Sequence, residues 1–108
     1  MDIKEFSDKY QNVPQVCVPG LTKGTIVYLI TERSVYVLEI ISPPECKAIA
    51  YGGYFKERNK EPCETFIIGS TPGGSMLHKG KLIEGLCCEF ENSVITSVIK
   101  KIFINYIN

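Results

Sequence analysis

The chain has 108 residues, of which 44% are apolar and 22% are charged, which is the size and composition of one globular domain. Twelve Lys and Arg balance twelve Asp and Glu, so no overall positive field is present to attract nucleic acid or an anionic membrane surface. The length excludes a second catalytic domain. We therefore expect residues 1–108 to form a single domain that folds around one core.

The beginning of the chain, "MDIKEF", carries acidic residues and lacks the apolar segment of a secretory signal. No apolar run approaches the roughly 18 residues that span a membrane. These features favour a cytoplasmic location. The five cysteines are an odd number and include no C-x-x-C pair, which is typical of reduced thiols, and we expect most of them to be buried. They are Cys17, Cys46, Cys63, Cys87 and Cys88.

The first 20 residues differ in character from the rest of the chain. Asp2 and Glu5 form a capping-box-like pair, and apolar residues follow at helical spacing, which predicts a short N-terminal helix. Pro14 and Pro19 lie five residues apart and forbid a helix there. We expect an extended segment that ends in a turn at Pro19-Gly20.

From residue 24 to residue 107, β-branched and aromatic residues dominate and predict six to eight short strands. Glu32-Arg33 separates the first two runs, which is typical of a hairpin. In the second run the alternation places Tyr36, Leu38 and Ile40 on one face. The predicted strands lie at 24–31, 34–41, 46–51, 63–70, 86–91, 94–98 and 100–105, and the polar segment 54–62 is expected to be an exposed loop.

Strands at this spacing, with no helical pattern between them, favour an all-β fold over alternating strands and helices. Two architectures fit a chain of this length, a small antiparallel β-barrel and a compact sandwich.

The stretch 69–80, "GSTPGGSMLHKG", contains four glycines, a proline and the chain's single histidine. Ser75 and Met76 stand where a phosphate-binding loop needs Lys and Ser or Thr, so this motif fails. Pro72 and Gly73 instead suit the middle of a tight turn that joins two strands. Pro72, Gly73 and His78 are therefore candidates for contacting a partner at the tip of this turn.

The run from Gly69 to Ser97 is similar to a pattern in small uncharacterised bacterial β-rich proteins. They share a G-S-T-x-G-G-S turn, an apolar residue, a glycine and then a short E-F strand. The similarity covers about a quarter of the chain and consists mainly of turn glycines, so it implies a fold and no activity. Pro72 departs from that pattern, which has a bulky or aromatic residue there. The matching residues are Gly69, Ser70, Thr71, Gly73, Gly74, Ser75, Leu77, Gly80, Leu82, Gly85, Glu89 and Phe90, followed by Thr96 and Ser97.

A cysteine-dependent enzyme is one alternative, with His78 as base and Cys87, Cys88, Ser70 or Ser75 as nucleophile. The G-x-S-x-G motif fails because Leu77 replaces its last glycine. Nothing in the spacing places a thiol beside His78, and scattered thiols with one imidazole do not predict a metal site. We therefore expect no catalytic residue, no metal and no cofactor.

A second alternative is a surface that binds single-stranded nucleic acid within residues 51–60. Aromatic rings stack on bases and cations follow the phosphate backbone, and small β-barrels often present such loops. Glu57 and Glu61 dilute the positive charge, which favours a solvated loop instead. The candidate contacts are Tyr51, Tyr54, Phe55, Lys56, Arg58 and Lys60.

Taken together, these observations favour a non-enzymatic binding or assembly domain whose partner is another protein or a second copy of the chain. A small barrel fills its interior with side chains and leaves few polar groups that converge on a substrate. The C-terminal segment 100–108, preceded by strand residues and guarded by Lys100 and Lys101, is the edge strand that we expect to pair with such a partner.

Overall fold

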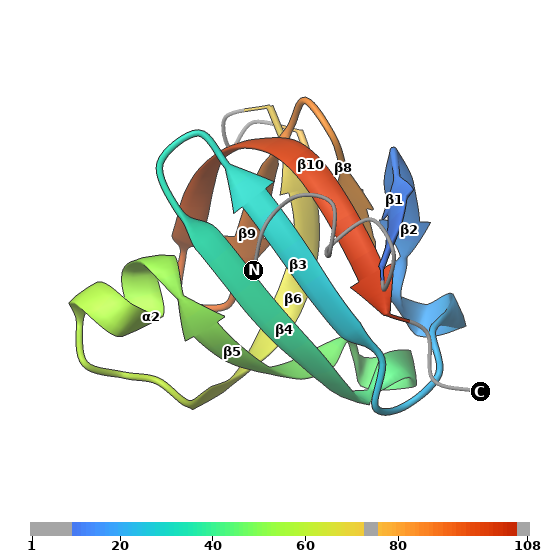
Figure 1. Ribbon diagram of the computed structural model, residues 1–108, viewed down its shortest axis with the longest axis horizontal. Coiled ribbons are helices and arrows are strands. Elements are labelled where there is room, and N and C mark those ends of the chain that lie inside the picture. Colours follow the sequence, from blue (N-terminus) through green and yellow to red (C-terminus); the bar gives the residue numbers. More distant parts are fainter. Residues whose placement is uncertain (1–9, 73–75, 106–108) are drawn as a thin grey trace.

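The computed structural model describes residues 10–72 and 76–105, so the predicted N-terminal helix lies outside the described residues. Figure 1 shows strands that wrap around one core, with a short helix at one side. The strands are β1 Gln11–Val13, β2 Gln15–Cys17, β3 Ile26–Thr31, β4 Val35–Ser42, β5 Lys47–Gly52, β6 Cys63–Thr71, β7 His78–Lys79, β8 Lys81–Ile83, β9 Cys87–Phe90 and β10 Val94–Asn105. The helices are the 3-10 turns η1 Val18–Gly20 and η2 Pro43–Glu45, and α2 Gly53–Glu57.

Six antiparallel strands close into a barrel. The order is β10, β3, β4, β5, β6 and β9, and β9 pairs again with β10. β1 extends this sheet beside β10 and β7 extends it beside β6, while β2 and β8 form a separate two-stranded ribbon. The predicted all-β fold is confirmed, and of the two predicted architectures it is the barrel.

The first predicted hairpin is present as β3 and β4. Its turn is closed by Thr31, whose backbone N–H and hydroxyl both donate to the carbonyl of Ser34, at 2.9 and 2.8 Å. The alternation in β4 holds, because Tyr36, Leu38 and Ile40 all point into the core. On the far side of the barrel, β9 buries Cys88 and Phe90 in the same way.

Residues 54–62 were expected to form an exposed loop, and this prediction is wrong for the first part of the segment. Gly53–Glu57 is the helix α2, and the side chain of Phe55 on it is only 2% exposed. The Phe55 ring packs against Phe90 and Tyr36, with centroid distances of 5.2 and 6.1 Å. Burial of this ring outweighs the polar character of the neighbouring residues, so the segment folds onto the barrel instead of extending into solvent.

The prediction that the C-terminal segment is a free edge strand is also wrong over its described part. Residues 94–105 form one long strand, β10, which pairs with β3 on one side and with β9 and β1 on the other. Its register shifts between Ile95 and Val98 and again between Ile99 and Lys101. Such bulges bend a strand, which lets β10 follow the curvature needed for closure.

Candidate functional site

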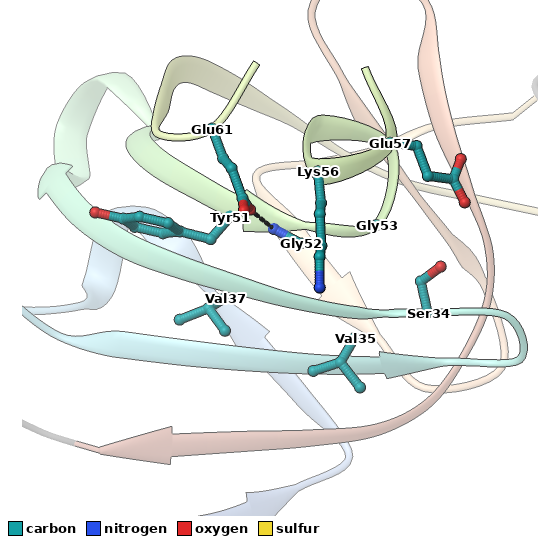
Figure 2. Close-up of a pocket in the computed structure, with 9 residues that line it drawn as sticks. All are labelled: Ser34, Val35, Val37, Tyr51, Gly52, Gly53, Lys56, Glu57 and Glu61. Carbon is teal, nitrogen blue, oxygen red and sulfur yellow. Dashed lines mark hydrogen bonds between the residues drawn. The ribbon is translucent and has the colours of Figure 1, made fainter. Parts of the chain in front are cut away.

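The largest group of exposed apolar side chains lies where α2 meets the β3–β4 hairpin. A hollow of about 550 Å³ opens there, between α2 and the outer face of β4 and β5 (Figure 2). Apolar side chains form one part of its wall and charged side chains of α2 and the following loop form another. The lining residues are Ser34, Val35, Val37, Tyr51, Gly52, Gly53, Lys56, Glu57 and Glu61.

Two glycines let the backbone pass close to its neighbours at the back of this hollow. Gly52 and Gly53 both have positive φ, +85° and +47°, which favours glycine. An added Cβ on Gly52 would overlap the carbonyl oxygen of Val35, and one on Gly53 would overlap the ring of Tyr36. The Glu61 carboxylate accepts the Gly52 N–H at 2.7 Å and so holds the loop after α2 against the end of β5 (Figure 2).

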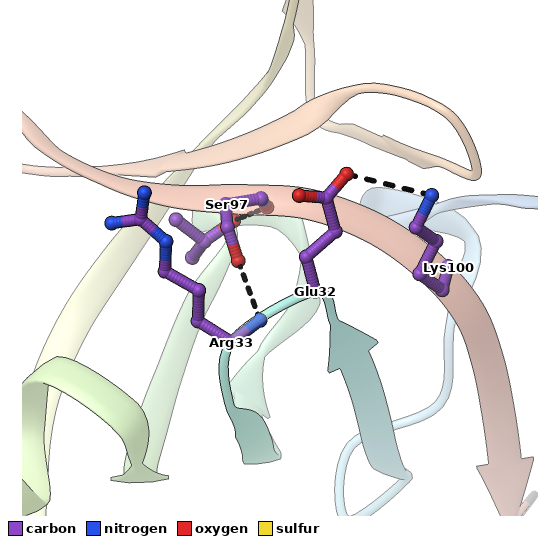
Figure 3. A network of polar contacts seen from close by, with 5 residues as sticks. Glu32, Arg33, Ser97 and Lys100 are labelled. Carbon is purple, nitrogen blue, oxygen red and sulfur yellow. Dashed lines mark hydrogen bonds and ion pairs between the residues drawn. The ribbon is translucent and has the colours of Figure 1, made fainter.

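A second hollow of about 230 Å³ adjoins the first, because Ser34 and Glu57 line both. Its remaining lining residues are Arg33, Tyr36, Tyr54, Ile95, Thr96 and Ser97. The Arg33 backbone N–H donates to the Ser97 hydroxyl at 3.1 Å, which ties the hairpin turn to β10 (Figure 3). Beside it the Lys100 ammonium lies 3.4 Å from the Glu32 carboxylate. The two hollows therefore adjoin at this end of the barrel, and we refer to the pair as the depression.

Five large apolar side chains are exposed among the described residues, and three of them line this depression. They are Val35, Tyr51 and Ile95, which are 48%, 38% and 44% exposed. We call these three residues, together with the charged Arg33, Lys56 and Glu57 around them, the end surface. The sequence pattern singled out Tyr51 and Lys56 but missed Val35 and Ile95, because both lie in ordinary strand sequence, on two strands that are not paired with each other.

The residues predicted to contact nucleic acid lie in different environments and do not form one surface. Tyr51 and Lys56 lie on the end surface, but Phe55 is buried and its ring is unavailable to stack on a base, so this part of the prediction is wrong. The Tyr54 ring already has its own cations nearby, with Arg58 and Lys60 each 5.4 Å from its centroid. Base stacking on Tyr54 would have to compete with these contacts.

Pro72 and His78 lie at another part of the barrel, directly after β6 and at the start of β7. Pro72 and His78 are exposed, and Gly73 lies outside the described residues. His78 on β7 pairs with Ser70 on β6, which confirms that this stretch connects two antiparallel strands. Gly69 is needed beside it, because a Cβ there would overlap the carbonyl oxygen of His78.

Ser70, a candidate nucleophile, is a buried structural residue. Its hydroxyl donates to the carbonyl of Lys81 at 2.8 Å and accepts the N–H of Ile83 at 3.1 Å, so it fastens β8 to β6. Ser70 lies between Cys88 on β9 and His78 on β7, and a strand therefore separates this thiol from the imidazole. Burial raises the pKa of the Cys88 thiol, which disfavours the nucleophilic thiolate.

All five thiols are free, but the expectation that most are buried is wrong. Cys88 is fully buried, Cys17 is exposed, and Cys46, Cys63 and Cys87 are half-buried. The reason is that Cys17, Cys63 and Cys87 lie at strand ends and Cys46 directly precedes β5, so none of them lies in the middle of a strand. Within residues 10–72 and 76–105, no three His, Cys, Asp or Glu side chains gather into a group that could hold a metal ion.

Comparisons of this chain with family models, with curated proteins and with solved structures give no match. In the part of the chain that the structure describes, there is no helix with the length and apolar character required to cross a membrane.

Proposed function

We propose that this chain is a non-catalytic domain that binds another protein through the end surface. The observation that carries the proposal is the gathering of Val35, Tyr51 and Ile95 around one depression, although they come from three different strands. Isolated exposed apolar residues are common on protein surfaces, whereas a contiguous group is typical of an interaction site.

The composition of the end surface supports a protein partner. Its centre is apolar and contains a tyrosine, and Arg33, Lys56 and Glu57 supply both signs of charge around it. Protein interfaces commonly combine an apolar centre with a polar rim and are enriched in Tyr and Arg. A side chain of a partner that enters the 550 Å³ hollow would contact Val35 and Tyr51 and could pair with Lys56 at the rim.

The two alternatives receive less support from the same residues. A single-strand-binding surface needs several free rings in a field of positive charge, and here Phe55 is buried and Glu57 and Glu61 lie beside Lys56. A cysteine-dependent enzyme needs a thiol within hydrogen-bond reach of a base, and Ser70 separates Cys88 from His78.

The proposal is tested by affinity capture from a native lysate, with and without nuclease. We expect a protein to be recovered in both conditions and to be lost when Val35→Asp and Ile95→Asp are combined, because two carboxylates in the apolar centre oppose its desolvation. The control combines Gln11→Asp with Thr22→Asp, which adds the same charge at exposed positions away from the end surface. Recovery that requires intact nucleic acid, or that survives the Val35 and Ile95 changes, would contradict the proposal.

A further inference from the structure

A third hollow, of about 380 Å³, lies on the outer face of β6, away from the end surface. It lies where β6 changes partners along its length. The N-terminal half of β6 pairs with β5, and residues Gly69 and Ser70 pair with β7. At the junction Cys46 and Gly80 both adopt positive φ, 56° and 68°, and both stay hydrogen-bonded to β6. The Ile67 N–H donates to the Cys46 carbonyl at 2.8 Å, and the Gly80 N–H donates to the Ile68 carbonyl at 2.9 Å. The hollow therefore lies on the outside of a closed junction.

The hollow has an apolar wall and two opposite charges. Pro19, Phe66 and Ile68 line it together with Cys46, Ile67 and the backbone of Gly80. The exposed side chains of Glu45 and Lys79 also line it. Neither of them makes an ion pair with any residue that the structure describes.

An exposed apolar projection stands beside this hollow, at the start of β7. Met76 and Leu77 are 64% and 40% exposed. Leu77 directly precedes β7 and lies two residues, about 7 Å along the chain, from Lys79, which lines the hollow.

From this arrangement we infer that a second copy of the chain docks on this face in a twofold symmetric dimer. Leu77 of each copy enters the apolar hollow of the other, and Lys79 of each copy pairs with Glu45 of the other. A projection and a hollow on one face, each flanked by an opposite charge, are complementary to a copy rotated by 180°. No other described hollow has an exposed apolar projection next to it, since Val35, Tyr51 and Ile95 lie within the walls of theirs.

The charges favour a second copy over an unrelated partner. The face carries one carboxylate and one ammonium, and twofold symmetry brings each opposite its counterpart, which forms two intermolecular ion pairs. A strongly acidic or basic partner would meet a like charge on one side. Ion pairs between exposed side chains contribute little to affinity, so we expect a dimer that dissociates on dilution.

The test uses two single charge reversals and their mixture. Lys79→Glu places two glutamates opposite each other in each half of its own dimer, and Glu45→Lys does the same with two lysines. We expect each variant alone to dimerise at least about tenfold more weakly than the wild type, because attraction becomes repulsion. An equimolar mixture of the two variants restores both ion pairs and should form a heterodimer. Sedimentation equilibrium over a wide concentration range measures all four cases.

Lys101→Glu is the control, since it reverses an exposed charge on β10 and should leave dimerisation unchanged. Circular dichroism confirms that each variant is folded. A wild-type protein that stays monomeric at every concentration would overturn the inference. It would also be overturned if the single variants dimerise as the wild type does, or if their mixture gains no heterodimer. None of these three results bears on the end surface, whose residues are unchanged in these variants.

Discussion

Tyr36 connects the core of the barrel to the end surface. Its ring packs between Phe55 and Phe90, at centroid distances of 6.1 and 5.9 Å, and its hydroxyl accepts the backbone N–H of Tyr54 at 3.1 Å. Burial raises the pKa of this phenol. By accepting the Tyr54 N–H, its oxygen holds the first turn of α2. The position of α2, and with it one wall of the depression, depends on this contact.

Gly53 provides a direct test of that packing. Gly53→Ala forces a side chain into a left-handed conformation and into the Tyr36 ring, so we expect the free energy of unfolding to fall by roughly 2–4 kcal/mol. Gly20→Ala is the matched control, because a Cβ there has no heavy atom within 4 Å, and it should change stability by less than about 0.5 kcal/mol. Urea unfolding measures both, and equal stabilities of the two variants would refute this account of α2.

Cys88 makes the stability depend on pH in the alkaline range. Burial raises the pKa of its thiol above the ordinary value of 9.0. Below pH 9 both the folded and the unfolded chain keep the proton, and the thiol's contribution is constant. Above pH 9 the unfolded chain releases it while the folded chain retains it, so the free energy of unfolding should fall by about 1.4 kcal/mol per pH unit for this group.

Urea unfolding under reducing conditions between neutral and alkaline pH measures this slope. Cys88→Ala removes the titrating group and should show a shallower decline than the wild type above pH 9. The interpretation fails if the two proteins lose stability in parallel, since the thiol would then contribute nothing to the pH dependence.

At the scale of elements, Ser70 joins the β2–β8 ribbon to the barrel. Ser70→Ala leaves the partly buried Lys81 carbonyl and Ile83 N–H without their partner, and we expect the free energy of unfolding to fall by roughly 2 kcal/mol. Hydrogen exchange at the Ile83 amide should also accelerate, because this N–H is released. Ser97→Ala removes one hydrogen bond at an exposed position and should cost under about 1 kcal/mol. Unchanged exchange at Ile83 would show that other contacts hold β8.

The sequence predicted strands correctly where apolar and polar side chains alternate within a single segment. Tyr36, Leu38 and Ile40 share one face as predicted, and that face lies toward the core along most of β4. α2 was not predicted, since its formation depends on Phe90 and Tyr36, which are distant in sequence from Phe55. Local polarity at Lys56 and Glu57 indicated a loop, and a tertiary contact decided otherwise.

The pairing of β10 illustrates a second limit. The β-branched residues of β10 correctly predicted a strand. The strands that pair with it depend on the whole barrel and cannot be inferred from the sequence of one segment. Lys100 and Lys101 resembled the charged residues that protect an edge, whereas they lie on the outward side of a strand that is paired on both edges.

At the scale of the whole molecule, closure of the barrel creates the candidate site. Val35 on β4, Tyr51 on β5 and Ile95 on β10 are widely separated in the sequence, and each is unremarkable in its own strand. Strand spacing was sufficient to predict an all-β fold, because that inference needs only the pattern of elements. The end surface could not be predicted, because it requires the strand order and the position of α2.

The claim that the end surface binds a protein is tested most directly by site-specific photocrosslinking in native lysate. A photoreactive phenylalanine analogue replaces Tyr51 in one variant and Lys23 in another. Lys23 precedes the start of β3, whereas the end surface lies beyond the other end of that strand. We expect a covalent adduct with a protein from position 51 and none from position 23. Adducts with nucleic acid, adducts of equal yield from both positions, or no protein adduct from position 51 would contradict the claim.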